Sequence, residues 1–318
     1  MSNNKIPKRL LQLTQEYSYP VSQIDLGGRS IKKFVRLDKC LFGGLVNSIK
    51  SGNSSYVTYL NDIIKDGYML QYVSTMQKSI NSYTYYYDKN AYSDVAGSRV
   101  ANMLGVKTCY NCLYSKKSKK GILKPTHLLS VDFLKNDEKM WTLSDLNGYG
   151  SVYTTPWHWI ECIDNVVNDS KSLFKGIDIK KHLPKLHDDF IEQFLLHNYV
   201  LADADYCSRN IGIIVDEKRG TMELAPSHDY DLCLNSDTAI DITWGLQLSM
   251  HGLSDMYPEQ LRNFMAKIDR YDAEKLRSQL MKEIPDKNFV DNYISLLSQN
   301  IDKIKKSYKH YTINEIIK

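Results

Sequence analysis

The chain has 318 residues, of which 42% are hydrophobic and 25% are charged, the balance of a globular protein rather than of a disordered segment. Its formal net charge of +4 is small for this length, so we do not expect a nucleic-acid partner, and no apolar stretch approaches the ~18 residues that a membrane helix needs. These features favour a cytoplasmic protein with room for two lobes or domains.

Short β-like segments broken by glycines follow a polar beginning in the first third of the chain. They are expected at residues 33–37, 41–46, 56–60 and 68–73. Between two of them, Ser51-Gly-Asn-Ser-Ser55 has the small residues that permit a tight turn with exposed backbone amides. This pattern predicts an antiparallel sheet with a flexible tip.

Helical spacing appears after these strands. Gly105 stands where a C-terminal cap would be, and the apolar residues before it fall on one face: Val95, Ala96, Val100, Met103 and Leu104. Two more strands are expected at 109–114 and 128–133, on either side of a basic loop at 116–120. We interpret that loop as a solvated hairpin loop.

Beyond Pro156 the spacing becomes mainly helical. A long helix is predicted at 186–201, and two short strands at 211–215 and 221–224 flank a turn. Three further helices are expected at 258–268, 272–283 and 287–307. The order predicts an α+β protein with a strand-rich N-terminal lobe at 1–133 and a mostly helical C-terminal lobe at 134–318.

The six cysteines are scattered along the chain, which is typical of reduced thiols rather than of a disulfide framework. Cys109 and Cys112 form a CxxC pair, but no second pair or nearby Cys/His cluster completes a four-ligand zinc site. Half-buried thiols are therefore the favoured interpretation of this pair.

Two acids and one amide in the second half have the spacing that phosphoryl transfer requires. In protein-kinase catalytic loops the acid that contacts the acceptor hydroxyl precedes a metal-binding Asn by five positions, and Asp205 and Asn210 have that separation. Asp229 follows the predicted hairpin, where a second metal-binding acid is expected. A DxxxxN pair alone is common by chance. The prediction depends on the order of the elements in the sequence: a helix, a loop, a hairpin and an acid follow one another after a strand-rich lobe.

These segments resemble the HipA-like serine/threonine kinases, bacterial enzymes with a two-lobed protein-kinase-like fold. The family's catalytic loop, approximately Asn-x-Asp-x-His-x-x-Asn, resembles Asp203 to Asn210, and its Leu-Ala-Pro-x-x-Asp motif resembles Leu224 to Asp229. The helix at 94–105 is similar to a family helix that begins with Glu and ends with Leu-Gly. The resemblance covers residues 42–235 and is strongest with short members that lack a separate N-terminal partner domain.

The resemblance implies ATP and Mg²⁺ as cofactors. Asp205 would orient or deprotonate the acceptor hydroxyl, while Asn210 and Asp229 would bind Mg²⁺. The nucleotide would be held by residues of the glycine/serine turn, the small lobe and the hinge between the lobes: Gly52, Asn53, Ser54, Ser55, Gln71, Lys78, Asp94, Val131 and Asp132. Ser54 and Ser55 would also be candidate autophosphorylation sites.

Several positions depart from the family pattern. Gln71 stands where a phosphate-binding lysine is expected, although a small shift of the alignment would place Lys78 there. Asp94 replaces Glu, and Cys207 replaces His. Asp203 replaces Asn beside the catalytic acid, and a second carboxylate would raise the pKa of one of the two if they approach each other. These departures leave both a weak kinase and a pseudokinase open.

The leading hypothesis is an ATP- and Mg²⁺-dependent HipA-like kinase that phosphorylates a Ser or Thr hydroxyl of a protein, with autophosphorylation as a further expectation. One alternative is a pseudokinase that binds a nucleotide or a partner without turnover. Another is a small-molecule kinase with the same catalytic core. The family likeness also suggests an antitoxin-like partner.

Overall fold

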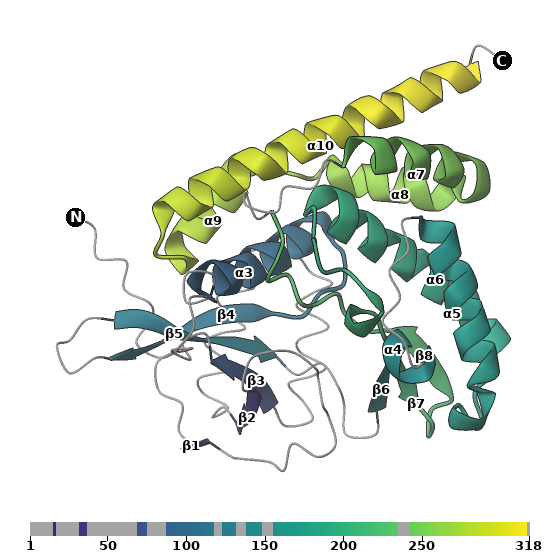
Figure 1. Ribbon diagram of the computed structural model, residues 1–318, viewed down its shortest axis with the longest axis horizontal. Coiled ribbons are helices and arrows are strands. Elements are labelled where there is room, and N and C mark those ends of the chain that lie inside the picture. The colour runs from purple at the N-terminus through teal and green to yellow at the C-terminus, as the bar shows by residue number, and fades with distance from the viewer. Residues whose placement is uncertain are drawn as a thin grey trace. The chain divides into compact units, whose positions relative to one another are not determined.

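The computed structural model describes residues 15–16, 32–36, 69–74, 87–117, 123–131, 138–147, 155–234 and 242–316 (Figure 1). The chain divides into two compact units, each formed by two stretches of sequence. The first comprises Met1–Phe133 and Asp272–Asn292, and the second comprises Leu134–Tyr271 and Tyr293–Lys318. Within the part of the chain that is described, no helix is both long and apolar enough to cross a membrane.

A five-stranded antiparallel sheet lies in the first unit, in the order β1-β2-β3-β5-β4. Its strands are β1 (Gln15–Glu16), β2 (Lys32–Arg36), β3 (Met69–Ser74), β4 (Asn111–Lys117) and β5 (Leu123–Val131). The predicted antiparallel sheet is therefore confirmed, with shifted strand ends. The strands expected at 41–46 and 56–60 lie outside the described residues.

Helix α3 (Tyr87–Leu104) packs on β4 and on α9 (Ala273–Glu283). It begins seven residues before the predicted helix and ends where predicted. Gly105 has φ 73°, and the next amide, of Val106, donates to the carbonyl of Ala101 at 2.9 Å. Glycine adopts this left-handed conformation without a steric penalty, so it ends the helix as a C-terminal cap.

A buried arginine joins α3 to α9 within the first unit. The side chain of Arg99 is 2% exposed, and its Nε and Nη2 donate to Glu283 Oε2 at 2.9 and 2.6 Å. Nη2 also donates to the carbonyl of Asn111 at 2.8 Å, and the guanidinium lies 4.1 Å from the ring centroid of Tyr110. The sequence-based division assigns residues 272–292 to the C-terminal lobe. This contact, across 184 positions of sequence, joins them to the first unit instead.

The second unit contains a three-stranded antiparallel sheet in the order β6-β7-β8. Its strands are β6 (Glu138–Thr142), β7 (Gly212–Asp216) and β8 (Thr221–Leu224). The predicted hairpin is formed by β7 and β8. At its turn, Asp216 Oδ1 accepts from the amides of Lys218 and Arg219 at 3.0 Å each, and Gly220 has φ 62°.

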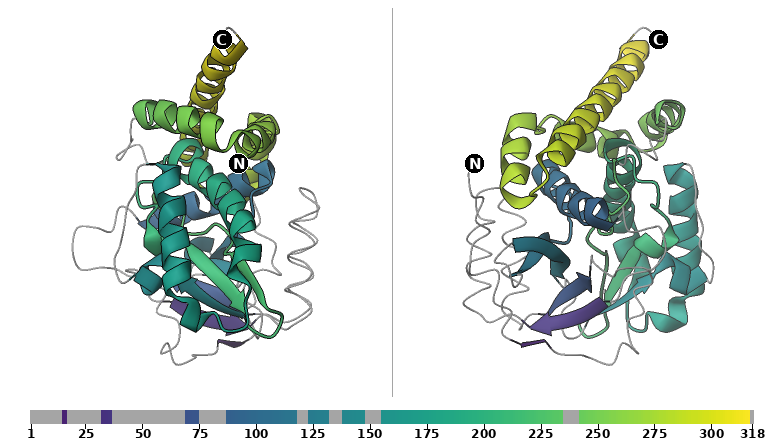
Figure 2. Two further views of the ribbon diagram at one scale, coloured as in Figure 1. Left: turned by 90° about the vertical axis from the view of Figure 1, so that its right-hand side faces the viewer. Right: turned by 60° about the vertical axis from the view of Figure 1, so that its left-hand side comes forward.

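Helices make up most of the second unit. They are α4 (Leu143–Asn147), α5 (Pro156–Asp169), α6 (Ile179–Leu195), α7 (Thr243–Met256), α8 (Pro258–Ile268) and the greater part of α10 (Lys287–Ile316), with short turns η3 (Lys171–Leu173), η4 (Leu196–Val200) and η5 (Ser208–Asn210). Helices α5 and α6 lie side by side (Figures 1 and 2). The fully buried rings of Trp159, Phe190 and Phe194 fill the space around them. This core supports the loop that follows α6.

Among the residues that the structure describes, Cys109, Cys162, Cys207 and Cys233 are buried. The expectation of a half-buried thiol at Cys109 is wrong, because only 4% of that residue is exposed.

Candidate functional site

Helix α6 does not end in a regular turn but in the π-helical turn η4. The amide of Leu201 donates to the carbonyl of Leu196 at 2.9 Å, and the amide of Asp203 donates to the carbonyl of His197 at 2.8 Å. Ala202, between them, has φ 45°. Such wide turns are frequent at functional sites. Here the turn leads the chain directly from a rigid helix into the loop that carries Asp205.

Asp205 is held by its backbone and presents its carboxylate outward. Its amide donates to Asp203 Oδ1 at 3.0 Å, and its carbonyl accepts from Asn210 Nδ2 at 2.8 Å. Its side chain is 46% exposed. A carboxylate on a fixed backbone and within reach of solvent meets two requirements of a general base, namely a defined position and access for the substrate.

Asn210 lies at the other end of the same loop and is 8% exposed. Its amide nitrogen donates to the carbonyl of Asp205, which fixes the orientation of the side chain. Its backbone amide donates to the carbonyl of Cys207 at 2.8 Å within η5. The side-chain oxygen Oδ1 is therefore the atom that would bind a cation.

Asp229 follows a buried segment that is fastened to the rest of the unit. The amide of Ala225 donates to the carbonyl of Gly212 at 2.8 Å, and the carbonyl of Ala225 accepts from Gln193 Nε2 at 2.7 Å. Asp229 itself is exposed and has φ 62°. Positive φ is uncommon for residues other than glycine and often marks a functional site. The neighbouring His228 is hydrogen-bonded, with Nδ1 2.9 Å from the carbonyl of Pro226.

Arg209 connects the two acids electrostatically. Its Nη2 is 3.6 Å from Asp205 Oδ1. A hydrogen bond to Cys207 and the charges of Cys207, Asp205 and Asp229 raise the pKa of the Arg209 guanidinium. Both carboxylates thus act on a single guanidinium. Asp205 and Asn210 thus share one hydrogen-bonded loop, and Asp229 lies close enough for its charge to act on the Arg209 guanidinium.

A buried histidine that could not be recognised from the sequence lies next to Asp203 and Ser227. The side chain of His197 is 1% exposed, with Nδ1 2.7 Å from Asp203 Oδ2 and Nε2 2.6 Å from Ser227 Oγ. The hydroxyl of Tyr230 donates to the same Ser227 Oγ at 2.6 Å. The imidazole is stacked between the rings of Tyr206 and Tyr230, whose centroids are 4.4 and 4.9 Å away. Burial, together with the charges of Asp203 and Cys207, raises the pKa of Tyr206 well above its usual range, so this ring is neutral.

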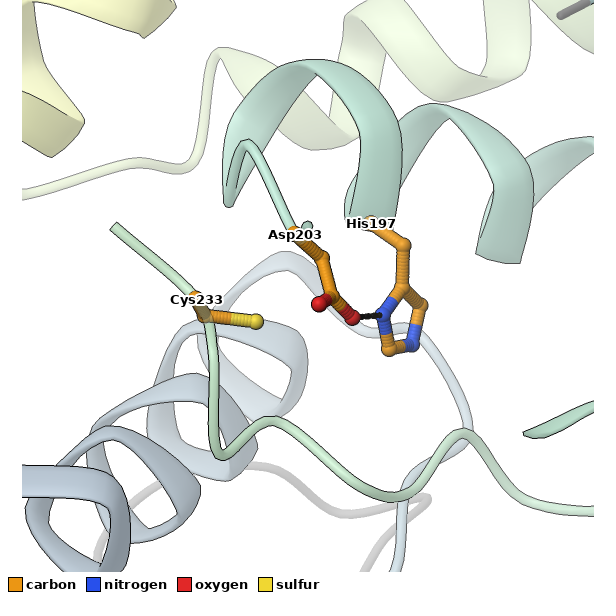
Figure 3. A group of neighbouring side chains, drawn as sticks. All are labelled: His197, Asp203 and Cys233. Atoms are coloured by element: carbon orange, nitrogen blue, oxygen red, sulfur yellow. Dashed lines mark hydrogen bonds and ion pairs between the residues drawn. The ribbon is translucent and has the colours of Figure 1, made fainter. Parts of the chain in front are cut away.

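His197, Asp203 and Cys233 each have one potential metal ligand atom within 4.8 Å of the others (Figure 3). Two atoms bound to one tetrahedral Zn²⁺ would lie about 3.3 Å apart. The 2.7 Å between His197 Nδ1 and Asp203 Oδ2 is a hydrogen-bond distance instead. The second ring nitrogen of His197 is also engaged, by Ser227. This geometry fits a hydrogen-bonded cluster and not a metal centre.

Comparison with solved structures relates this fold to that of a known kinase. The chain is similar to the Helicobacter pylori proinflammatory kinase CtkA, with a TM-score of 0.59 over 94% of this chain and 97% of that chain, at 14% sequence identity. The chain has a protein-kinase-like fold. It also matches HipA of Shewanella oneidensis MR-1, from a toxin–antitoxin complex with HipB and operator DNA, with a TM-score of 0.42, 13% identity, and 76% of this chain and 60% of that chain covered. No protein-family model matches the chain, and neither does any curated protein.

The residues expected to hold the nucleotide in this kinase-like fold are only partly described. The backbone of Gln71 lies on β3, opposite Phe34 and Ser130, and Val131 ends β5. Asp94 is buried in α3, and its carbonyl accepts from Asn111 Nδ2 at 3.2 Å. The other expected contacts lie outside the described residues: Gly52, Asn53, Ser54, Ser55, Lys78 and Asp132.

Proposed function

We propose that this protein is an ATP- and Mg²⁺-dependent kinase that transfers the γ-phosphoryl group to a Ser or Thr hydroxyl of a protein. The observation that carries the proposal is the loop between η4 and β7. Asp205 presents an exposed carboxylate there from a backbone that is hydrogen-bonded on both sides, and one of those bonds comes from Asn210. The similarity of the fold to a kinase supports this assignment.

In the proposed reaction Asp205 accepts a hydrogen bond from the acceptor hydroxyl and directs its oxygen toward the γ-phosphorus. Asn210 Oδ1 and the Asp229 carboxylate would hold Mg²⁺, since both offer the hard oxygen ligands that this ion prefers. When bound, the ion offsets the charge of the phosphate groups. Arg209 reduces the repulsion between the two carboxylates while the cation is absent, because it carries a positive charge close to both.

The nucleotide side of the site stays a prediction from the sequence resemblance. The resemblance predicts that Gly52, Asn53, Ser54 and Ser55 bind the phosphates, with Gln71 or Lys78 in the place of the phosphate-binding lysine. Asp94, Val131 and Asp132 complete the predicted set. Autophosphorylation at Ser54 or Ser55 and an antitoxin-like partner are predictions of the same origin.

The decisive experiment measures transfer of labelled phosphate from ATP to the protein itself and to a generic protein substrate. Asp205→Asn preserves the size of the side chain, and we expect it to lower the rate by at least about 100-fold, the scale of general-base catalysis. A matched control is Glu217→Gln, which removes an exposed acid in the β7–β8 turn whose side chain pairs with Lys139. Equal labelling by the wild type and Asp205→Asn would overturn the proposal.

A pseudokinase is the second candidate, and it is favoured by Gln71 at the position of the expected lysine. A protein of this kind would be stabilised by Mg²⁺-ATP against thermal unfolding, because the ligand binds only the folded state. It would transfer no phosphate under the same conditions. Labelling of hydroxyl-bearing metabolites without labelling of protein would indicate a small-molecule kinase instead.

A further inference from the structure

An unbroken series of hydrogen bonds crosses the interior of the second unit, from the residues on either side of Asp229 to the loop that carries Asp205. It begins at the hydroxyl of Tyr230, which donates to Ser227 Oγ. It continues through the two ring nitrogens of His197 to Asp203 Oδ2. It ends where Asp203 Oδ1 accepts from the amide of Asp205 at 3.0 Å.

The donors and acceptors of this series define one proton arrangement. Tyr230 donates to Ser227 Oγ, so the single hydroxyl hydrogen of Ser227 is directed to Nε2 of His197. Nδ1 of His197 then carries the ring hydrogen and donates it to the Asp203 carboxylate. In this arrangement every hydrogen in the series lies between two neighbours.

The position of this series in the sequence relates it to both predicted functional acids. Asp203 lies two residues before Asp205, and Ser227 lies two residues before Asp229. The side chains of His197 and Asp203 are both 1% exposed, and hydrogen bonds are stronger in such a low-dielectric interior. Because aromatic rings cover both faces of the imidazole, rotation of His197 is restricted.

We infer that His197 and Ser227 are positioning residues of the proposed kinase site. They fix Asp203, and through it the amide of Asp205, relative to the segment that carries Asp229. The inference rests on the proposed function, since only a reaction at Asp205 makes this distance matter. A buried polar network is weak evidence for stability, because apolar residues of similar volume often stabilise a protein as well or better. What such a network does supply is a fixed position for each residue that it joins.

Two buried serines allow a matched test. Ser227 and Ser249 are 1% and 0% exposed, and each has its Oγ 2.6 Å from a tyrosine hydroxyl, of Tyr230 and Tyr199 respectively. Ser227→Ala breaks the series, whereas Ser249→Ala removes a comparable hydrogen bond between Tyr199 and α7. We expect similar decreases in melting temperature. Only Ser227→Ala should lower kcat, by about 10- to 100-fold with the KM for ATP nearly unchanged, the scale of a misplaced catalytic group.

Hydrogen exchange tests the same inference without relying on activity. In the full-length protein the amide of Asp205 should exchange faster in Ser227→Ala than in the wild type or in Ser249→Ala, while the amides of β7 keep their protection. If Asp205-dependent transfer is absent from the wild type, the proposed function fails, and the exchange comparison still tests the coupling. Equal effects of the two serine variants on exchange or on kcat would overturn the inference. Stoichiometric zinc bound through His197 would overturn it as well.

Discussion

Asp229 has a backbone conformation that only a few residue types adopt readily. Its φ of 62° lies in the left-handed region, where Asp and Asn are enriched among non-glycine residues. Asp229→Asn should therefore preserve the backbone and remove only the charge. We expect a melting temperature within about 2 °C of the wild type without ligand.

The same variant tests the metal assignment, because Asp229→Asn should lose most of the stabilisation that Mg²⁺-ATP gives the wild type. Asp229→Ala should lose it too and should also unfold more easily without ligand, by up to about 1 kcal/mol, since alanine is strained at positive φ. Thermal unfolding with and without Mg²⁺-ATP measures both effects. An undiminished response to Mg²⁺-ATP in the Asn variant would show that Asp229 does not bind the metal.

We expect the protein to lose stability at alkaline pH because of the buried side chain of Tyr199. Burial raises its pKa to about 12, although its hydrogen bond with Ser249 acts in the opposite direction. The usual value is 10.0, so the folded state holds this proton more tightly, and the corresponding stability is present below pH 10 and is lost as the pH rises toward 12.

By pH 11 this loss should reach about 1 kcal/mol relative to pH 9. Tyr199→Phe removes the titrating group, so its stability should fall less over the same interval, even though the variant lacks the hydrogen bond to the Gly245 carbonyl. Urea unfolding at pH 9 and pH 11 compares the two proteins. A larger decrease in the variant than in the wild type would contradict the assignment of the shift to this residue.

The candidate site residues that could be proposed from the sequence are those that lie close together along the chain. Asp205 and Asn210 are five positions apart on one loop, and Asp229 follows the adjacent hairpin. His197 could not be recognised in the same way, because its partner Ser227 is 30 positions away. A histidine at the end of an apolar helix has no local feature that distinguishes a positioning residue from an ordinary core residue.

At the scale of elements, helix α7 depends on a glycine for its packing. A Cβ atom at Gly252 would lie 2.3 Å from Cζ3 of Trp157, in the first turn of α5. Gly252→Ala should therefore destabilise the protein by about 1–3 kcal/mol through overpacking, despite the higher helix propensity of alanine.

Gly245, in the same helix, provides the control. A Cβ there would be 3.7 Å from the nearest atom, Tyr199 Oη, which is an ordinary contact. Gly245→Ala should leave the stability unchanged or increase it by up to about 1 kcal/mol. Urea unfolding of both variants decides the matter, and equal effects of the two substitutions would contradict this account of α7.

Elements with local start and stop signals were predicted closely. Helix α8 begins at Pro258, and the side chain of Asp272 accepts from the amide of Lys275 at 2.9 Å at the start of α9. The start of α6 was missed, because the helix begins at Ile179 and continues through Pro184, a residue that usually ends or bends a helix. Tertiary packing outweighed the local signal there.

At the scale of the whole molecule, the order of a strand-rich part followed by a helical part could be predicted from periodicity alone. The return of residues 272–292 to the first unit could not, because the contacts that hold them there, such as those of Arg99 with Glu283 and of Tyr92 with Phe289, join residues far apart in the sequence. A fragment that ends near Phe133 would lack α9 and would leave a buried guanidinium without its carboxylate.

This contact leads to a direct comparison of two ion pairs that both involve α9. Arg99→Met should destabilise the protein by about 3 kcal/mol, since it leaves Glu283 partly buried without its main partner. Arg277→Met breaks the exposed pair with Asp291 and should change the stability little. Chemical unfolding measures both, and similar effects of the two variants would show that the Arg99 pair does not hold the segment.

The π-helical turn η4 also limits how many residues this part of the chain can have. The bond from Leu201 to Leu196 spans five residues, one more than in an α-helix. Deleting one residue after His197 would let the α-helix continue and would rotate the following loop by about 100° relative to α6. Asp203 would then turn away from the imidazole. Among chains with the same fold and the same loop, we therefore expect the amino acids of this turn to vary, while the number of residues in it stays constant.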